Sequence, residues 1–197
     1  VEIEVTQINS STRKAERKID MVAEEKPVHI FLNGEHYVTI LSSPDQLSEL
    51  AVGHLLSQGI LKSLGEIEDM KLDNRAFHIR LRDDVDIRKR MLVSKPLGRV
   101  ILSSCGSSNY WPLAGLIDRL HLRKIQDKAT VDSRIISESV KHLNVAARLF
   151  RRTGGVHVAA LYSFGGDMLA LAEDIGRHNA VDKVIGAAAL GGLGFGE

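Results

Sequence analysis

The sequence contains a single cysteine, Cys105, among its 197 residues. One thiol cannot form an internal disulfide, and it cannot supply the several thiolates of a multi-cysteine zinc site. A charge excess is also lacking, because 26 Lys and Arg residues nearly balance 25 Asp and Glu residues, for a formal net charge of +1. We therefore expect neither a nucleic acid nor a membrane surface as partner, because no overall field attracts them.

Long apolar runs are missing as well. No uninterrupted run approaches the roughly 18 residues that a membrane helix needs, and the polar, charged N-terminal segment has no apolar core of a signal peptide. The hydrophobic content of 44% and charged content of 26% are typical of a folded globular chain. Together with the lack of disulfides, these features lead us to expect a soluble, cytoplasmic protein.

Alternating and β-rich segments predict several strands in the first half of the chain. Residues 1–18 begin as an edge strand and continue as a basic linker. Residues 26–43 predict a hairpin about Asn33 and Gly34, a favoured two-residue turn. The alternation in residues 76–84 predicts one more short strand.

A helix is expected to follow that hairpin. Ser43 is a suitable N-cap, Pro44 fits the first helical position, and Gln46 completes a capping box. Gly59 is a plausible end of the helix. The face predicted to be buried contains Leu47, Leu50, Ala51, His54 and Leu55.

The second half has a different pattern. A strand at residues 99–104 leads to Cys105, a strong helix is expected over residues 131–150, and a pair of strands over 156–176 precedes a final helix from Arg177. The evidence for the long helix is the spacing of four, three, four and three residues between its apolar positions Ile136, Val140, Leu143, Ala147 and Phe150. This order of elements predicts an α/β layer domain.

Cys105 lies where a buried strand should emerge into a turn rich in Gly and Ser that opens a helix. Backbone N–H groups at a helix start stabilise a thiolate, which can act as a nucleophile or as a sulfur carrier. The alternative is an inert cysteine in the core. Because the chain has one thiol, a switch between an internal dithiol and a disulfide is excluded.

A glycine pair marks a second candidate segment, in which Thr153, Gly154 and Gly155 lie at a helix end and His157 lies on the following strand. Adjacent glycines permit left-handed backbone and the close approach of a ligand. A glycine helix stop beside a core histidine is the other interpretation.

The densest polar cluster is "AEDIGRHNAVDK", residues 172–183. An apolar strand ends in acidic residues, a glycine turns the chain, and a helix opens with basic residues that we expect to converge as an anion site for phosphate. The alternative is a capped helix with surface ion pairs. The candidate residues are Glu173, Asp174, Gly176, Arg177, His178, Asn179, Asp182 and Lys183.

With these segments in view, the chain resembles the FdhD/NarQ family of formate dehydrogenase accessory sulfurtransferases. "EEKPVHIFLNG" and "SSPDQLSELAVGHLLSQGIL" are similar to its N-terminal region, "RVILSSCG" to its sulfur-carrying loop, and "TGGVHVAAL" and "GRHNAVDK" to its later segments. The resemblance implies an α/β fold with a cytidine-deaminase-like, layered mixed-sheet domain over residues 99–197. A smaller N-terminal α+β region would occupy residues 1–98, and the charged segment 85–98 marks the boundary.

The resemblance also implies a function. The protein would take persulfide sulfur from a cysteine desulfurase onto Cys105 and deliver it to the molybdenum or tungsten bis-pterin guanine dinucleotide cofactor of formate dehydrogenase. The segments that contain Thr153, Gly154, Gly155 and His157, and residues 173–183, would help to bind that cofactor. No structural metal is expected, and the partners would be the desulfurase, the dehydrogenase catalytic subunit and a second copy of the chain. Whether such a carrier counts as an enzyme stays open.

Two departures from the family pattern matter. Members usually carry C-G-x-C in the sulfur-carrying loop, and Ser108 stands at the second cysteine position, which removes any relay between two thiols. The family also extends beyond the glycine-rich segment, so the second domain is expected to be truncated at its C-terminus. Two other functions remain open: an insertion chaperone that binds the cofactor without using Cys105, and a zinc or thiol hydrolase, against which the missing paired-cysteine signature speaks.

Overall fold

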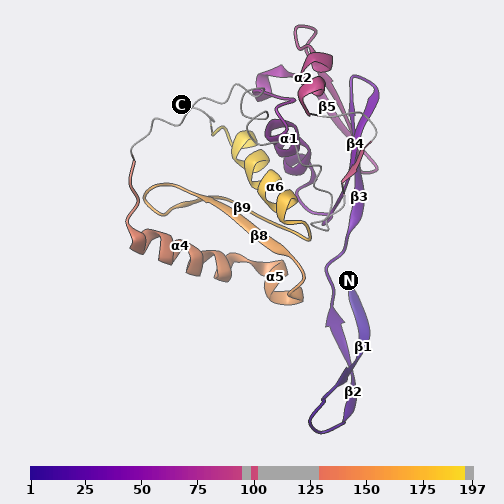
Figure 1. Cartoon of the computed structure of the whole chain (residues 1–197), viewed down its shortest axis with the longest axis vertical. Helices are drawn as coiled ribbons and strands as arrows, with labels where there is room; N and C mark the ends of the chain where they lie inside the picture. The colour runs from indigo at the N-terminus through magenta and orange to yellow at the C-terminus, as the bar shows by residue number, and fades with distance from the viewer. Residues whose placement is uncertain (95–98, 102–128, 194–197) are drawn as a thin grey trace.

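The first half of the chain forms a mixed sheet. The structure is a computed structural model that describes residues 1–94, 99–101 and 129–193 (Figure 1). The sheet contains β3 (Lys26–Leu32), β4 (Glu35–Ser42), β5 (Ile67–Asp73), β6 (Ala76–Leu81) and β7 (Arg99–Ile101), in the order β5-β6-β3-β4-β7. β3 pairs antiparallel with β4 and parallel with β6, and β4 pairs parallel with β7.

The predicted hairpin is confirmed. β3 and β4 are joined by Asn33 and Gly34, whose φ angles of 48° and 87° are both left-handed, as a tight hairpin turn of the right twist requires. The predicted strand at residues 76–84 is also present as β6, with alternate residues buried. Period-two burial on β3 and β6 directs one face of the sheet towards the helix that follows β4.

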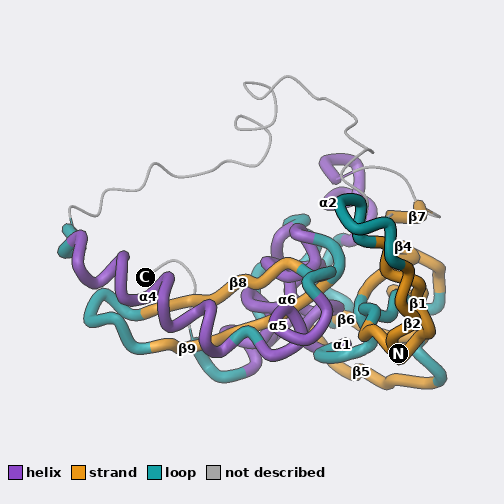
Figure 2. The backbone as a smooth tube through the Cα atoms, turned by 90° about the horizontal axis from the view of Figure 1, so that it is seen from below, coloured by secondary structure: helices purple, strands orange, loops and turns teal. Residues whose placement is uncertain are grey.

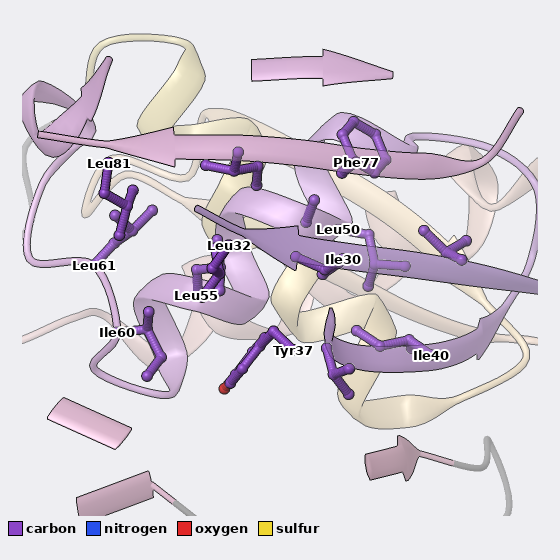
Figure 3. Packing of buried hydrophobic residues seen from close by; sticks show 14 of the residues in the cluster. Ile30, Leu32, Tyr37, Ile40, Leu50, Leu55, Ile60, Leu61, Phe77 and Leu81 are labelled. Atoms are coloured by element: carbon purple, nitrogen blue, oxygen red, sulfur yellow. The ribbon is translucent and has the colours of Figure 1, made fainter. Parts of the chain in front are cut away.

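That helix, α1 (Leu47–Ser57), covers the sheet and closes the main apolar core (Figure 3). Ile30 and Ile40 from the strands and Leu50 and Leu55 from the helix are fully buried. The short 3-10 helix η1 (Leu64–Glu66) and helix α2 (Ile87–Ser94) follow at the edge of this layer. Removing several such side chains from water provides the main driving force for folding of this half.

The expected N-cap at Ser43 and first helical position at Pro44 are wrong, because the helix begins three residues later, at Leu47. Gln46, with φ 52° and ψ 46°, takes the N-cap position without capping through its side chain. Ser43 is instead used in a tertiary contact: its Oγ accepts a hydrogen bond from Ile175 N at 3.1 Å. The predicted end near Gly59 is confirmed, since this glycine has φ 68° just after the C-cap residue Gln58.

The second half adds β8 (His157–Tyr162), β9 (Met168–Asp174) and α6 (Arg177–Leu190), as the sequence predicts. β8 and β9 form an antiparallel sheet. α6 lies between this sheet and α1 (Figure 1). The two helices approach to backbone contact at Gly53 and Gly186, where an added Cβ would overlap Asp182 O and Glu49 O, respectively.

The single helix expected over residues 131–150 is two helices, α4 (Ser133–Ala146) and α5 (Arg148–Thr153). The chain breaks at the buried Ala147, whose ψ is 88°. A carboxylate from β9 stabilises the new helix start, because Glu173 accepts hydrogen bonds from Leu149 N and Phe150 N at 2.9 and 2.7 Å.

The apolar stripe by which that helix was predicted is largely exposed. α4 runs along the β8–β9 sheet (Figure 2), yet Ile136 and Val140 are 56% and 52% exposed. Phe150 on α5 is exposed too, whereas Ala147 is buried. Periodicity identified the apolar stripe correctly but did not show which neighbour would cover it.

Residues 1–18 are not an edge strand with a linker. β1 (Glu2–Ile8) and β2 (Ala15–Met21) pair along their whole length as a separate antiparallel hairpin. Figure 1 shows this hairpin projecting from one end of the molecule. The basic segment is therefore its turn and second strand, with Asn9 accepting backbone N–H bonds at the turn.

The mixed α/β class is confirmed by the sheets and helices described here. The cytidine-deaminase-like layering stays a prediction, and so does the division into residues 1–98 and 99–197, whose boundary adjoins residues 95–98 outside the described part. In that described part, no helix is long and apolar enough to cross a membrane.

Candidate functional site

The polar segment at residues 172–183 forms the junction between β9 and α6, and the centre of this junction is a buried carboxylate. Asp174 is 0% exposed at the end of β9. Its oxygens accept hydrogen bonds from Ser43 N at 3.0 Å, Gly176 N at 2.8 Å and Asn179 Nδ2 at 3.0 Å. Hydrogen bonds to the ionised form offset much of the desolvation that burial imposes on a carboxylate.

The counter-charge of Asp174 comes from α6. Lys183 Nζ lies 2.7 Å from Asp174 Oδ2, and both side chains are 0% exposed. The ammonium also donates to Ser43 O at 3.2 Å and to Glu173 O at 3.3 Å. Every proton of this buried ammonium therefore has a nearby acceptor, the condition under which a buried cation is tolerated.

The same network ties the junction to the connection between β4 and α1. Asn179 Nδ2 donates to Leu41 O at 2.8 Å, and Ile175 N donates to Ser43 Oγ. Residues about 130 positions apart in sequence thus hold one another in place. The start of α6 is fixed against the main core by polar contacts.

One turn further along α6, Asp182 makes a second polar contact with α1. Its Oδ2 lies 3.0 Å from His54 Nδ1, and its Oδ1 accepts a hydrogen bond from Ser57 Oγ at 2.7 Å. His54 is only 4% exposed. Asp182 therefore fixes the relative rotation of the two helices rather than facing solvent.

Only part of the expected convergence of basic groups is present. Arg177 and His178 are exposed in the first turn of α6, but Lys183 and Asp182 are buried, so the expectation that all these residues form one open anion site is wrong. The physical reason is that Lys183 and Asp182 lie on sides of α6 that face β9 and α1. There Asp174 pairs with Lys183, and α1 offers buried partners to Asp182. Asn179 is likewise buried.

The first turn of α6 retains the chemistry of an anion site. Its N-cap residue, Gly176, has no side chain with which to cap the first N–H groups of the helix. Helix N-terminal N–H groups carry partial positive charge, and Arg177 and His178 are exposed beside them. This turn can hold a phosphate oxygen without competing with the internal pairs.

The second predicted segment lies at the same end of the β8–β9 sheet. His157 at the start of β8 pairs in register with Asp174 at the end of β9. Gly154 ends α5 with φ 62°, and Thr153 Oγ1 donates to Leu149 O at 2.9 Å and accepts from Gly155 N at 3.2 Å. His157 is exposed, so the interpretation as a core histidine is wrong.

The structure gives each member of the acidic pair a separate role. Glu173, predicted as a site residue with Asp174, caps α5 through its carboxylate. Thus the start of α5 and the start of α6 are both anchored to the end of β9. The structure brings together the two segments that were expected to line a cofactor. Several of their side chains, however, belong to the buried hydrogen-bond network that holds the segments in place.

Cys105 and Ser108 lie outside the described residues. Among the described residues, no group of three His, Cys, Asp or Glu side chains is placed to share a metal ion. The expectation that no structural metal is present stays a prediction, as do the cofactor-binding roles of the residues named above.

Sequence reasoning missed the α1 side of this site. Ser43 was assigned to a helix cap, and His54 was placed on an apolar face. The signal was present in that second placement, because a histidine among apolar helix positions needs a polar partner when buried. Its partner, Asp182, lies 128 residues away and could not be identified from local pattern.

Comparison with known proteins gives consistent results. The sequence profile described as the FdhD/NarQ family matches residues 23–197. A protein of Shouchella clausii named sulfur carrier protein FdhD is 34% identical over 180 residues, covering 88% of this chain and 64% of that protein. One of the same name from Sulfolobus acidocaldarius is 35% identical over 169 residues, covering 85% of this chain and 62% of that protein.

A solved structure supports the fold. A crystal structure described as that of a formate dehydrogenase accessory protein from Desulfotalea psychrophila superposes with a TM-score of 0.69 at 22% identity. The match covers 97% of this chain and 68% of that one. The chain spans less than two thirds of the length of the two curated relatives above. On the family match and these identities, the chain belongs to the FdhD/NarQ family.

Proposed function

We propose that the protein is a sulfur carrier in the maturation of formate dehydrogenase. Cys105 would receive persulfide sulfur from a cysteine desulfurase and deliver it to the molybdenum or tungsten bis-pterin guanine dinucleotide cofactor, which is the substrate of the delivery step. The partners would be the desulfurase, the catalytic subunit of the dehydrogenase and a second copy of the chain.

Family membership is the observation that carries this proposal. The matched relatives are named sulfur carrier proteins, and the match to the family spans residues 23–197, which include Cys105. As the sole cysteine, Cys105 is the only thiol on which this chain can carry sulfur.

Loading of a single thiol is chemically complete. The Cys105 thiolate attacks the outer sulfur of the desulfurase persulfide, the sulfur–sulfur bond breaks, and the desulfurase thiolate leaves. The product is a persulfide on Cys105, and no external oxidant or reductant is consumed. Ser108 takes no part in this step, because a hydroxyl does not exchange with a persulfide.

The β9–α6 junction would bind the phosphates of the client cofactor. Arg177, His178 and the N-terminal amides of α6 offer the positive groups, and the loop of Thr153, Gly154 and Gly155 with His157 lies at the same end of the sheet. Asp174, Asn179 and Lys183 would act indirectly, because their buried network holds the first turn of α6 in position.

The first experiment is the intact mass of the protein after incubation with a cysteine desulfurase, cysteine and pyridoxal phosphate. We expect a gain of about one sulfur atom that a reductant removes, and no gain in Cys105→Ala. Circular dichroism of the variant controls for folding. A folded parent chain that gains no sulfur beside an active desulfurase would contradict the carrier function.

The exposed basic turn of α6 favours one alternative, a cofactor-insertion chaperone that does not use Cys105. Guanosine diphosphate, the nucleotide part of the cofactor, is a suitable probe. Both proposals predict weaker binding in Arg177→Ala, with Arg152→Ala as a matched exposed control on α5. Dehydrogenase maturation separates them: the carrier requires Cys105, whereas the chaperone continues to work in Cys105→Ser.

A further inference from the structure

The N-terminal hairpin, residues 1–22, precedes the segment matched by the family profile, which begins at residue 23. Its strands are exposed at nearly every position, and apolar Ile8 and Ile19 are 69% and 72% exposed. Figure 1 shows it standing away from the layers that hold the core.

A two-stranded hairpin of this kind is marginally stable in water by itself, and in the described part of the chain no third strand pairs with β1 or β2. Its unpaired edge groups can pair with another strand. On the side of the body, α5 contacts β2, and β1 lies on the other side of β2 (Figure 1). β1 is therefore the freer edge.

The hydrogen bonds that close the hairpin show which groups of β1 face outward. Val1 N donates to Val22 O, Val22 N donates to Val1 O, and Asn9 N donates to Lys14 O. Because antiparallel pairs alternate, odd-numbered residues of β1 bond to β2, and even-numbered residues direct their N–H and C=O groups away from it. The outward residues are Glu2, Glu4, Thr6 and Ile8.

We propose that β1 pairs antiparallel with β1 of a second copy of this chain, about a two-fold axis at Val5. In this register Glu4 lies opposite the partner's Thr6, and Glu2 lies opposite the partner's Ile8. Every outward-facing residue of β1 is then hydrogen-bonded, and the hairpins form a four-stranded sheet. The opposed side chains include no pair of like charges, which would be destabilising.

The other edge fits a second copy less well. The register that pairs all outward residues of β2 is centred on Lys18 and places this ammonium directly opposite the partner's Lys18. Alternative registers on β1 are also worse, since centring on Glu4 opposes two carboxylates. Charge pattern and hydrogen-bond direction thus select one edge and one register.

Analytical ultracentrifugation of the full chain tests the pairing. We expect the parent to sediment as a dimer of the 21.7 kDa chain. Thr6→Pro removes an outward N–H but no bond within the hairpin, and should raise the dimer dissociation constant about tenfold or more. Arg17→Pro, the matched change on the outward edge of β2, should leave it unchanged. A monomeric parent, or a dimer insensitive to Thr6→Pro, would overturn the proposal.

The register has its own test, which the single native cysteine makes possible. In a Cys105→Ser background, Val5→Cys places two thiols opposite each other in a non-hydrogen-bonded pair, where Cα atoms are about 4.5 Å apart and a disulfide can form. We expect a disulfide-linked dimer after mild oxidation. Lys18→Cys, on the neighbouring strand, should stay unlinked. Linking of Lys18→Cys with Val5→Cys unlinked would overturn the β1 register.

The inference goes beyond sulfur transfer and does not depend on it. The hairpin lies outside the core, so unchanged circular dichroism is expected for each variant. A Thr6→Pro chain that still dimerises but loads sulfur normally would reject the hairpin pairing alone, leaving the carrier function supported.

Discussion

Helix α1 has two buried faces that are built from different chemistry. Towards the mixed sheet it presents Leu50, Ala51 and Leu55, which join a wholly apolar cluster. Towards α6 it presents Gly53, where backbones touch, and His54, which pairs with Asp182. The same eleven-residue helix is therefore held against the mixed sheet by buried apolar surface and against α6 by specific contacts.

The difference affects how precisely α1 is positioned against each of its two neighbours. Apolar packing is non-directional and tolerates small shifts when volume is kept. A buried hydrogen bond such as that between His54 and Asp182 adds little net stability, but it is satisfied in only one arrangement. We infer that the sheet face of α1 supplies most of the folding free energy, whereas the α6 face sets where Arg177 and His178 lie.

The largest expected effect is at the buried pair that joins α6 to β9. Lys183→Met leaves Asp174 buried without its counter-charge, and should lower the free energy of unfolding by about 3–5 kcal/mol in urea titrations. Lys141→Met, which breaks an exposed pair with Glu138, should change it by less than about 1 kcal/mol. Equal effects of the two changes would mean that Asp174 is not held as a buried ion.

The apolar face should be sensitive for another reason. Ile30→Ala removes a fully buried side chain and leaves a cavity, and should cost about 2–5 kcal/mol. Leu72→Ala, at a half-exposed leucine in the same sheet, is the control. Ile30→Ala should leave the binding of guanosine diphosphate to the folded protein unaltered, whereas Lys183→Met should weaken it. This result would separate the role of apolar packing from that of the buried polar contacts.

Close backbone contact is the third feature of the comparison. Gly186→Ala puts a methyl group against Glu49 O and forces the helices apart, which should lower the free energy of unfolding by about 1–3 kcal/mol. This outweighs the gain in helix propensity of about 1 kcal/mol. Gly65→Ala, where a Cβ meets only Ser63 Oγ at 3.7 Å, is the control. A stabilised Gly186→Ala would show that the helices can separate freely.

The partly buried ion pair between Arg90 and Glu66 can be compared with the fully buried pair of Lys183 and Asp174. Arg90 Nη1 and Nη2 donate to Glu66 at 2.6 and 2.8 Å, and hydrogen bonding to this guanidinium lowers the pKa of Glu66 below its ordinary 4.5. Because the folded pKa is the lower one, the stabilisation is present above the unfolded pKa and is lost as pH falls through the folded value.

Glu66→Gln measures that contribution. We expect it to reduce stability by about 1 kcal/mol near neutral pH and to make no difference in acid, well below the folded pKa. Urea titrations of parent and variant at both conditions check this. A difference that persists in acid would assign the effect to packing instead.

The smallest effect is expected at the periphery. Val140→Ala on α4 should change the free energy of unfolding by less than about 0.5 kcal/mol, because the side chain is 52% exposed. Val28→Ala, the same change at a fully buried position of β3, should cost clearly more. Equal losses would show that another part of the molecule covers α4.

Several features could be predicted because their causes are local. The hairpin turn at Asn33 and Gly34, the helix stop at Gly154 and the strand pair before α6 depend on turn chemistry and short-range alternation. The break at Ala147 could not be predicted, because it depends on Glu173 capping α5 from another strand.

The site shows the same division. Its residue types and the helix start at Arg177 could be read from the sequence, as could the glycine loop before His157. Which side chains face solvent could not. Lys183 and Asp182 pair inward with Asp174 and His54, and only the arrangement of α1, β9 and α6 determines those pairs.

The sequence by itself determined the β3–β4 hairpin, the β8–β9 strand pair, the single thiol and the family, because these follow from local composition, spacing and motif. Tertiary structure alone decided that the polar residues after β9 divide into a buried frame and an exposed turn. The physical reason is that a charge can be buried only beside groups that satisfy it. Lys183 is near Asp174 in sequence, but Ser43 and His54, which complete the contacts of Asp174 and Asp182, come from more than a hundred residues away.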